Sequence, residues 1–132
     1  MQISELARLS GVSVHRLRRY EEQGLLVAER RPSGYREFPA SAVREAVFIS
    51  MGRDLGFSLK ALAETLPRYR AGTLTIDQMI GELQDRIAEV DAAIAGQRAL
   101  RRKLVDHIAW FKQRQRASAR STPSTRPRKA SP

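Results

Sequence analysis

The chain has 132 residues and a formal net charge of +10, enough for one modest domain and an extension. It contains no cysteine, which excludes disulfides, zinc–thiolate sites, iron–sulfur clusters and thiol redox switches. Its first residues lack the basic and apolar regions of a signal peptide, and no apolar run is long enough to cross a membrane. We therefore expect a cytoplasmic protein.

Two short helices joined by a glycine turn are predicted at the start of the chain. Residues 3–9 have the apolar spacing of an amphipathic helix. Gly11 supplies the turn, and Ser13 is a good N-cap for a second helix that ends near Gln23. Gly24 follows where a C-terminal glycine cap belongs. This arrangement predicts a helix-turn-helix.

A small basic hairpin and two further helices are predicted next. Residues 25–31 and 35–38 can pair as short strands across Pro32-Ser33-Gly34, which has the composition of a turn. Helical spacing then predicts helices over residues 40–55 and 59–69. Residues 1–70 therefore form one small domain, a winged helix-turn-helix, followed by a linker at residues 71–74.

A long helix is predicted over residues 75–113. Residues 75–78 fit the capping-box pattern. Apolar residues then recur in alternating steps of four and three, a heptad seam about 58 Å long in which Gln97 and Arg101 fill two places. The apolar residues of the seam are Ile76, Ile80, Leu83, Ile87, Val90, Ile94, Leu104, Ile108 and Phe111.

The chain has no second long amphipathic helix to cover this seam. Its partner must come from another molecule, which predicts a homodimer. The alternative is a helix that folds back on its own N-terminal domain, because surface helices also carry apolar stripes.

The last part of the chain, residues 114–132, is basic and without periodicity. It carries six Lys and Arg and no acidic residue, with Pro123, Pro127 and Pro132 along it. We expect a disordered tail. Either it adds sequence-independent affinity for phosphates, or it is a solvated tail without a role. A chain of this charge favours polyanions as partners.

The second helix has one face for the core and another for a ligand. A projection at 100° per residue turns Val14 and Leu17 towards the core and the following set away from it: His15, Arg16, Arg19 and Tyr20. A helix that enters a major groove beside a hairpin that holds the phosphate backbone is a design for binding DNA. We therefore expect Ser13, His15 and Arg16 near base edges or phosphates, and Arg19 and Tyr20 as further DNA contacts on the same face.

The wing supplies the second group of candidate DNA contacts. Tyr35 and Arg36 follow the hairpin turn, and Arg30 precedes it. The alternative for each arginine of the helix or wing is a solvated side chain or an ion pair within the protein. The alternative for Tyr35 is packing on the second helix.

Six motifs in register, together with the long helix, resemble the MerR family of bacterial transcription regulators. They are Ile3-Ser4-Glu5-Leu6-Ala7, Gly11-Val12-Ser13, Leu17-Arg18-Arg19-Tyr20-Glu21, Gly24-Leu25-Leu26, Gly34-Tyr35-Arg36 and Leu55-Gly56-Phe57-Ser58-Leu59. The resemblance covers residues 1 to about 112. It implies a mainly α-helical protein in which a winged helix-turn-helix precedes an antiparallel coiled-coil dimer.

The resemblance also implies how such a protein acts. The homodimer binds operators within promoters whose spacer is too long, and bends and untwists the DNA so that RNA polymerase engages both promoter elements. By resemblance, Arg18 and Lys60 are further DNA contacts. Arg19 stands where the family usually has tyrosine, and Pro39 where a cap of the third helix is common. The cysteines of the metal-sensing and redox-sensing branches are absent.

Tyr69, Trp110 and Phe111 raise the question of an effector. They either pack so as to couple the two parts of the protein or line a pocket for a small-molecule effector. His15 and His107 have no further ligand nearby in the sequence, so we expect neither a metal site nor a cofactor.

The sequence as a whole predicts a transcription regulator and not an enzyme, because no constellation of catalytic residues is present. The alternatives are an architectural or excision-type DNA-binding factor with the same winged fold, or a coiled-coil adaptor that does not bind DNA.

Overall fold

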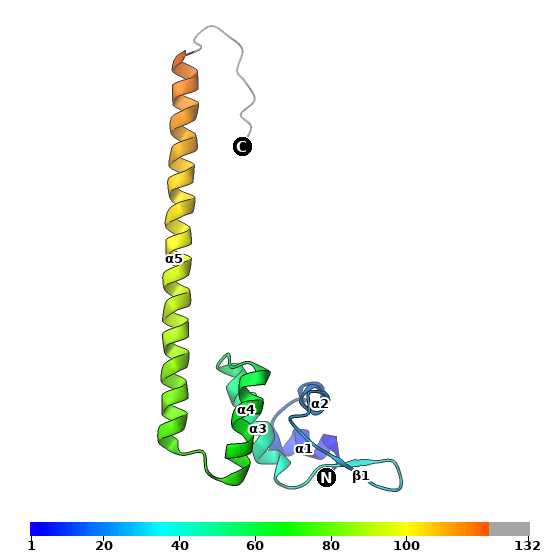
Figure 1. The fold of residues 1–132 in the computed structure, drawn as a ribbon. Coiled ribbons are helices and arrows are strands. Elements are labelled where there is room, and N and C mark those ends of the chain that lie inside the picture. Colours follow the sequence, from blue (N-terminus) through cyan, green and yellow to red (C-terminus); the bar gives the residue numbers. More distant parts are fainter. Residues whose placement is uncertain (122–132) are drawn as a thin grey trace. The chain divides into compact units, whose positions relative to one another are not determined.

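The computed structural model describes residues 1–121 and divides the chain into two units, residues 1–82 and residues from 83 on. The order of elements is α1 (Ile3–Ser10), α2 (Val14–Glu22), β1 (Glu29–Arg30), β2 (Arg36–Glu37), α3 (Ala42–Asp54), α4 (Leu59–Ala71) and α5 (Ile76–Ser121). Figure 1 shows α1 to α4 and the hairpin gathered around one another. The predicted winged helix-turn-helix and the long C-terminal helix are thus confirmed.

The predicted signals at the helix ends form hydrogen bonds. The Ser13 hydroxyl accepts from the Arg16 backbone N–H at 3.2 Å and starts α2. Gly24, just beyond α2, has φ +76°, a left-handed conformation that costs glycine little. At the start of α5 the predicted capping box is complete, because Thr75 and Gln78 each accept the other's backbone N–H, at 3.1 and 3.0 Å.

The core of the first unit lies where these short elements meet. α3 packs against both α1 and α4, and α1 packs against α2. Arg70 of α4 forms an ion pair with Glu45 of α3 and donates to the Leu25 carbonyl at 2.6 Å, which fixes the chain after α2 to the rest of the domain. The buried apolar residues are Leu6, Val12, Leu17, Tyr20, Leu25, Leu26, Phe38, Ala42, Ala46, Ile49, Leu62 and Leu66.

The hairpin is shorter than the sequence predicts. Only Glu29–Arg30 and Arg36–Glu37 form a ladder, in antiparallel register. Leu25 and Leu26 instead turn into the core and donate their backbone N–H groups to the Tyr20 carbonyl at 2.9 and 3.3 Å. Burial of these two leucines removes them from the strand.

The long helix extends further than predicted. α5 continues to Ser121, so the expectation of disorder from Arg114 is wrong for residues 114–121. That stretch contains only Arg, Gln, Ala and Ser, of which arginine, glutamine and alanine favour helix, and it has no glycine or proline. The rest of the predicted tail, residues 122–132, lies outside the described residues.

Candidate nucleic-acid interface

The exposed side of α2 carries most of the side chains predicted to contact DNA. His15, Arg18 and Arg19 are exposed, and Arg16 is partly exposed. Among residues 1–121, the side chains of Arg18 and Arg19 form no hydrogen bond or ion pair, so their guanidinium groups are available to a ligand. Leu17 is fully buried on the opposite side, as the helix projection predicts.

Tyr20 does not lie on this surface. The projection turned it away from the core, but the structure buries it to 3% exposure, so the prediction that it contacts DNA is contradicted. The reason is that the C-terminal end of α2 packs on two sides, since Leu25, Leu26 and Phe38 join the same cluster. The Tyr20 hydroxyl forms no hydrogen bond within the described part of the chain.

The two faces of the hairpin have opposite charge. The register places Glu29 opposite Glu37 on one face and Arg30 opposite Arg36 on the other, because successive residues of a strand alternate in direction. On the acidic face, Arg31 forms an ion pair with Glu37. The hydrogen bond from Arg31 holds the pKa of the Glu37 carboxyl below its usual range. The basic face is the one that faces α2.

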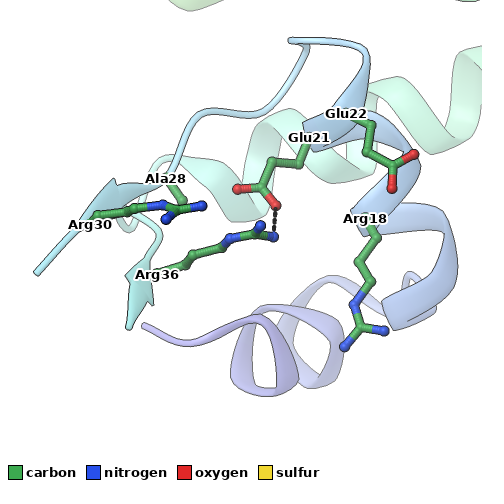
Figure 2. A pocket seen from close by; sticks show the side chains of 6 residues that line it. All are labelled: Arg18, Glu21, Glu22, Ala28, Arg30 and Arg36. Carbon is green, nitrogen blue, oxygen red and sulfur yellow. Dashed lines mark hydrogen bonds and ion pairs between the residues drawn. The ribbon is translucent and has the colours of Figure 1, made fainter. Parts of the chain in front are cut away.

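A pocket of about 310 Å³ lies between α2 and the hairpin (Figure 2). Arg36 donates to Glu21 at 2.7 Å across it. The helix and the wing approach each other at this pocket, and its three arginines, side chains that bind phosphate groups, outnumber its two glutamates. Its lining residues are Arg18, Glu21, Glu22, Ala28, Arg30 and Arg36.

Arg16, a second predicted DNA contact, is also paired with a carboxylate. Asp54, the last residue of α3, lies 3.3 Å from the Arg16 guanidinium. In the free protein, Arg16 and Arg36 therefore form ion pairs with carboxylates of the same chain, which is the alternative to a DNA contact that the sequence left open. Sequence reasoning missed Glu21 and Asp54. The position of Glu21, one turn beyond Leu17 on the inner side of α2, could have indicated a contact within the protein. No sequence pattern could have indicated Asp54, because it is 38 residues from Arg16.

The remaining predicted contacts are exposed and separate from the pocket. Tyr35 is 64% exposed at the hairpin turn, so it does not pack on α2. Lys60, in the first turn of α4, is also exposed. Both stay predicted DNA contacts.

The residues of the proposed effector pocket are found in separate units. Tyr69 stacks on Phe48 of α3 with ring centroids 4.3 Å apart. Trp110 meets Phe111 edge-on at 4.9 Å, and the Arg114 guanidinium lies 4.7 Å from the Trp110 ring. Within residues 1–121, no group of three or more His, Asp or Glu residues is placed to hold a metal ion.

The heptad seam of α5 is uncovered in the single chain. Its nine large apolar side chains are between 41% and 71% exposed. None of the helices in the described part of the chain is both long and apolar enough to span a membrane. The seam is thus an apolar surface that a second helix can cover.

Known proteins share both the sequence pattern and the fold. The MerR HTH family of regulatory proteins matches residues 1–69, and the MerR DNA-binding family matches residues 43–107. The HTH-type transcriptional regulator HmrR of Sinorhizobium medicae (strain WSM419) is 34% identical over 110 residues, which span 83% of this chain and 74% of HmrR.

Two solved structures resemble this one. PbrR691 of Ralstonia metallidurans CH34, a transcription regulator in complex with lead(II), superimposes with a TM-score of 0.64 at 26% identity over 80% of this chain and 83% of its own. HiNmlR, a MerR family regulator that lacks the sensor domain and is bound to promoter DNA, shares the fold with a TM-score of 0.54 at 24% identity over 90% of each chain. The chain therefore belongs to the MerR family of DNA-binding transcription regulators, whose members act on promoter DNA as dimers.

Proposed function

We propose that α2 enters the major groove of promoter DNA while the basic face of the hairpin holds the adjacent phosphate backbone. The observation that carries this proposal is the pocket between them, in which arginines of α2 and of both strands surround one hollow. In such an interface phosphate contacts fix the position of the protein, and side chains at the start of the helix read the bases.

We assign the base-reading role to His15 and Arg16 at the start of α2, with Ser13 beside them. The phosphate contacts are Arg18, Arg19, Arg30, Tyr35, Arg36 and Lys60. All of these side chains are exposed or partly exposed. The whole chain has a net charge of +10, and this positive charge favours a polyanion as the ligand.

A homodimer joined along the α5 seam carries two copies of α2, one for each half-site of the operator. We propose that the dimer bends and untwists the promoter spacer, so that RNA polymerase engages both promoter elements. Deforming a duplex costs several kcal/mol, which contacts at both half-sites repay. This role is binding rather than catalysis and belongs to the bacterial cytoplasm, where the DNA is.

Selection from a random duplex library tests the proposal. The purified chain should enrich a sequence with two-fold symmetry, because a symmetric dimer reads two half-sites. Shortening the spacer of a promoter that contains this sequence should make transcription independent of the protein. Failure to enrich any sequence would refute DNA reading by α2.

A metal effector acting through thiolates is not available to these 132 residues, which contain no cysteine. We propose that any effector is instead a small molecule held at an apolar surface such as Trp110 and Phe111. Adding zinc, copper(I) or lead(II) ions should leave the affinity for the enriched duplex unchanged. A change of affinity at micromolar metal would contradict this proposal.

A further inference from the structure

The hairpin places two positive charges directly opposite each other. Arg30 and Arg36 are cross-strand partners in a ladder of only two residue pairs. Like charges at such positions repel, and a two-stranded hairpin is marginally stable by itself. The register of this wing therefore needs a negative charge on the basic face.

Glu21 of α2 supplies that charge. Its carboxylate lies 2.7 Å from the Arg36 guanidinium, and in Figure 2 it points towards the guanidinium groups of both Arg30 and Arg36. The Glu21 side chain is only 19% exposed, whereas that of Arg36 is 50% exposed. The carboxylate is thus held against the protein, and the arginine keeps an open side towards a ligand.

Glu22 provides a contrast within the same pocket. It also lines the hollow, yet in Figure 2 its carboxylate points away from Arg36, and among the described residues it forms no ion pair. The two neighbouring glutamates carry the same charge and line the same pocket. Only one of them contacts the wing.

We propose that Glu21 is a positioning residue, which holds the paired arginines of the wing against α2 in the geometry that receives a DNA phosphate. This inference rests on the proposed function. A tethered arginine contacts a phosphate only where the duplex fits α2 and the wing together, whereas a released arginine reaches phosphates in any register. Glu21 therefore raises the affinity for the cognate sequence relative to other DNA.

The test compares Glu21→Gln with Glu22→Gln, using the duplex enriched by the wild-type chain and a scrambled duplex of equal length. Each variant removes one negative charge from the pocket. With Glu21→Gln, the ratio of the two affinities should fall about fivefold, the magnitude expected for a partly exposed ion pair. With Glu22→Gln the ratio should stay within a factor of two of the wild-type ratio.

Coupling to Arg36 separates positioning from a general role in folding. In an Arg36→Ala background, Glu21→Gln should cause no further fall in the ratio, because the arginine that it positions is gone. Equal ratios for Glu21→Gln and Glu22→Gln, or an equal loss of affinity for both duplexes, would overturn the inference. The inference would also be overturned if Glu21→Gln lowered the ratio of the two affinities about fivefold in the Arg36→Ala background as well.

A second, more conservative variant tests the inference if Glu21→Gln unfolds the domain. Glu21→Asp keeps the charge but shortens the side chain by one methylene, so it should lower the ratio at least twofold, and an unchanged ratio would overturn the inference. If the wild-type chain enriches no duplex, the proposed function fails together with this inference. If the wild-type chain does enrich a duplex, the Glu21 variants test only the positioning role of Glu21 and not the proposed function.

Discussion

Arg16 and Arg36, two of the cations expected to meet DNA, are paired with carboxylates of other elements in the free protein. Arg16 of α2 pairs with Asp54 of α3, and Arg36 of β2 pairs with Glu21 of α2. Such pairs are partly solvated, so each adds little to the stability of the fold. Their larger effect is on where the guanidinium groups lie when DNA arrives, because fewer side-chain conformations remain to be lost on binding.

Arg36→Ala should weaken binding to the enriched duplex and make the slope of log affinity against log salt shallower by about one, because one phosphate contact is lost. Titration of fluorescently labelled duplexes at several salt concentrations measures that slope. Arg31→Ala is the matched control, since Arg31 pairs with Glu37 on the other face of the same hairpin. A slope made shallower equally by both variants would contradict the assignment of the faces.

Arg16→Ala should instead change which bases are preferred, because Arg16 lies in the first turn of α2, where base edges are read. Selection from a random duplex library, repeated with the variant, provides the measurement. Arg8→Ala in α1, which removes an exposed ion pair with Glu5, should return the wild-type sequence. The same sequence from Arg16→Ala would show that Arg16 contacts phosphates or only Asp54.

At the scale of elements, the contact between α3 and α4 depends on a glycine within a helix. A Cβ atom at Gly52 would lie 2.3 Å from one methyl carbon of Leu62 and within 3.3 Å of two more atoms of that side chain. Leu62 is 5% exposed and belongs to the core, so it has little room to move. Close packing of the two helices thus requires Gly52, although glycine weakens a helix.

Gly52→Ala should lower the free energy of unfolding by about 1–2 kcal/mol, since the strain of overpacking exceeds the gain in helix propensity. Urea unfolding followed by circular dichroism measures the change. Gly96→Ala in α5 is the control, because nothing lies within 4 Å of the added Cβ there. That control should stabilise its helix by about 0.5–1 kcal/mol. Destabilisation by both variants alike would argue against a specific contact with Leu62.

At the scale of the whole molecule, the long helix is a surface that one copy leaves unpaired. Its seam residues are exposed, and its charges are divided along its length. Residues 76–95 carry five acidic residues and one basic residue, whereas residues 96–121 carry eight basic residues and one acidic residue. An antiparallel pair of helices places unlike charges side by side, and a parallel pair places like charges together. The charge pattern therefore agrees with the antiparallel orientation that the family resemblance implies.

Ile94→Lys should convert the dimer into monomers at micromolar concentration, because it places a charge in the middle of the apolar seam. Sedimentation velocity measures the species present. Affinity for the enriched duplex should then fall on the order of a hundredfold, since two linked half-site contacts become one. Ala92→Lys adds the same charge on the opposite side of the helix and should leave the dimer intact. A dimeric Ile94→Lys protein would exclude this seam as the interface.

The sequence by itself determined the elements whose causes are local. Ser13, Gly24 and the Thr75–Gln78 capping box placed the helix ends, and the heptads placed α5. The end of α5 does not follow from composition, because a basic, polar stretch is typical of disorder although arginine, glutamine and alanine also form helix.

Only the tertiary structure decided what depends on contacts between distant residues. Tyr20 is buried because the chain after α2 folds over the side of that helix that a projection leaves exposed. Likewise, Glu21 and Asp54 meet their arginines across 15 and 38 residues of sequence, where local periodicity carries no information. The helices and their order thus follow from hydrogen bonds and apolar spacing within each segment. The binding surface follows from how α2, α3 and the hairpin pack together.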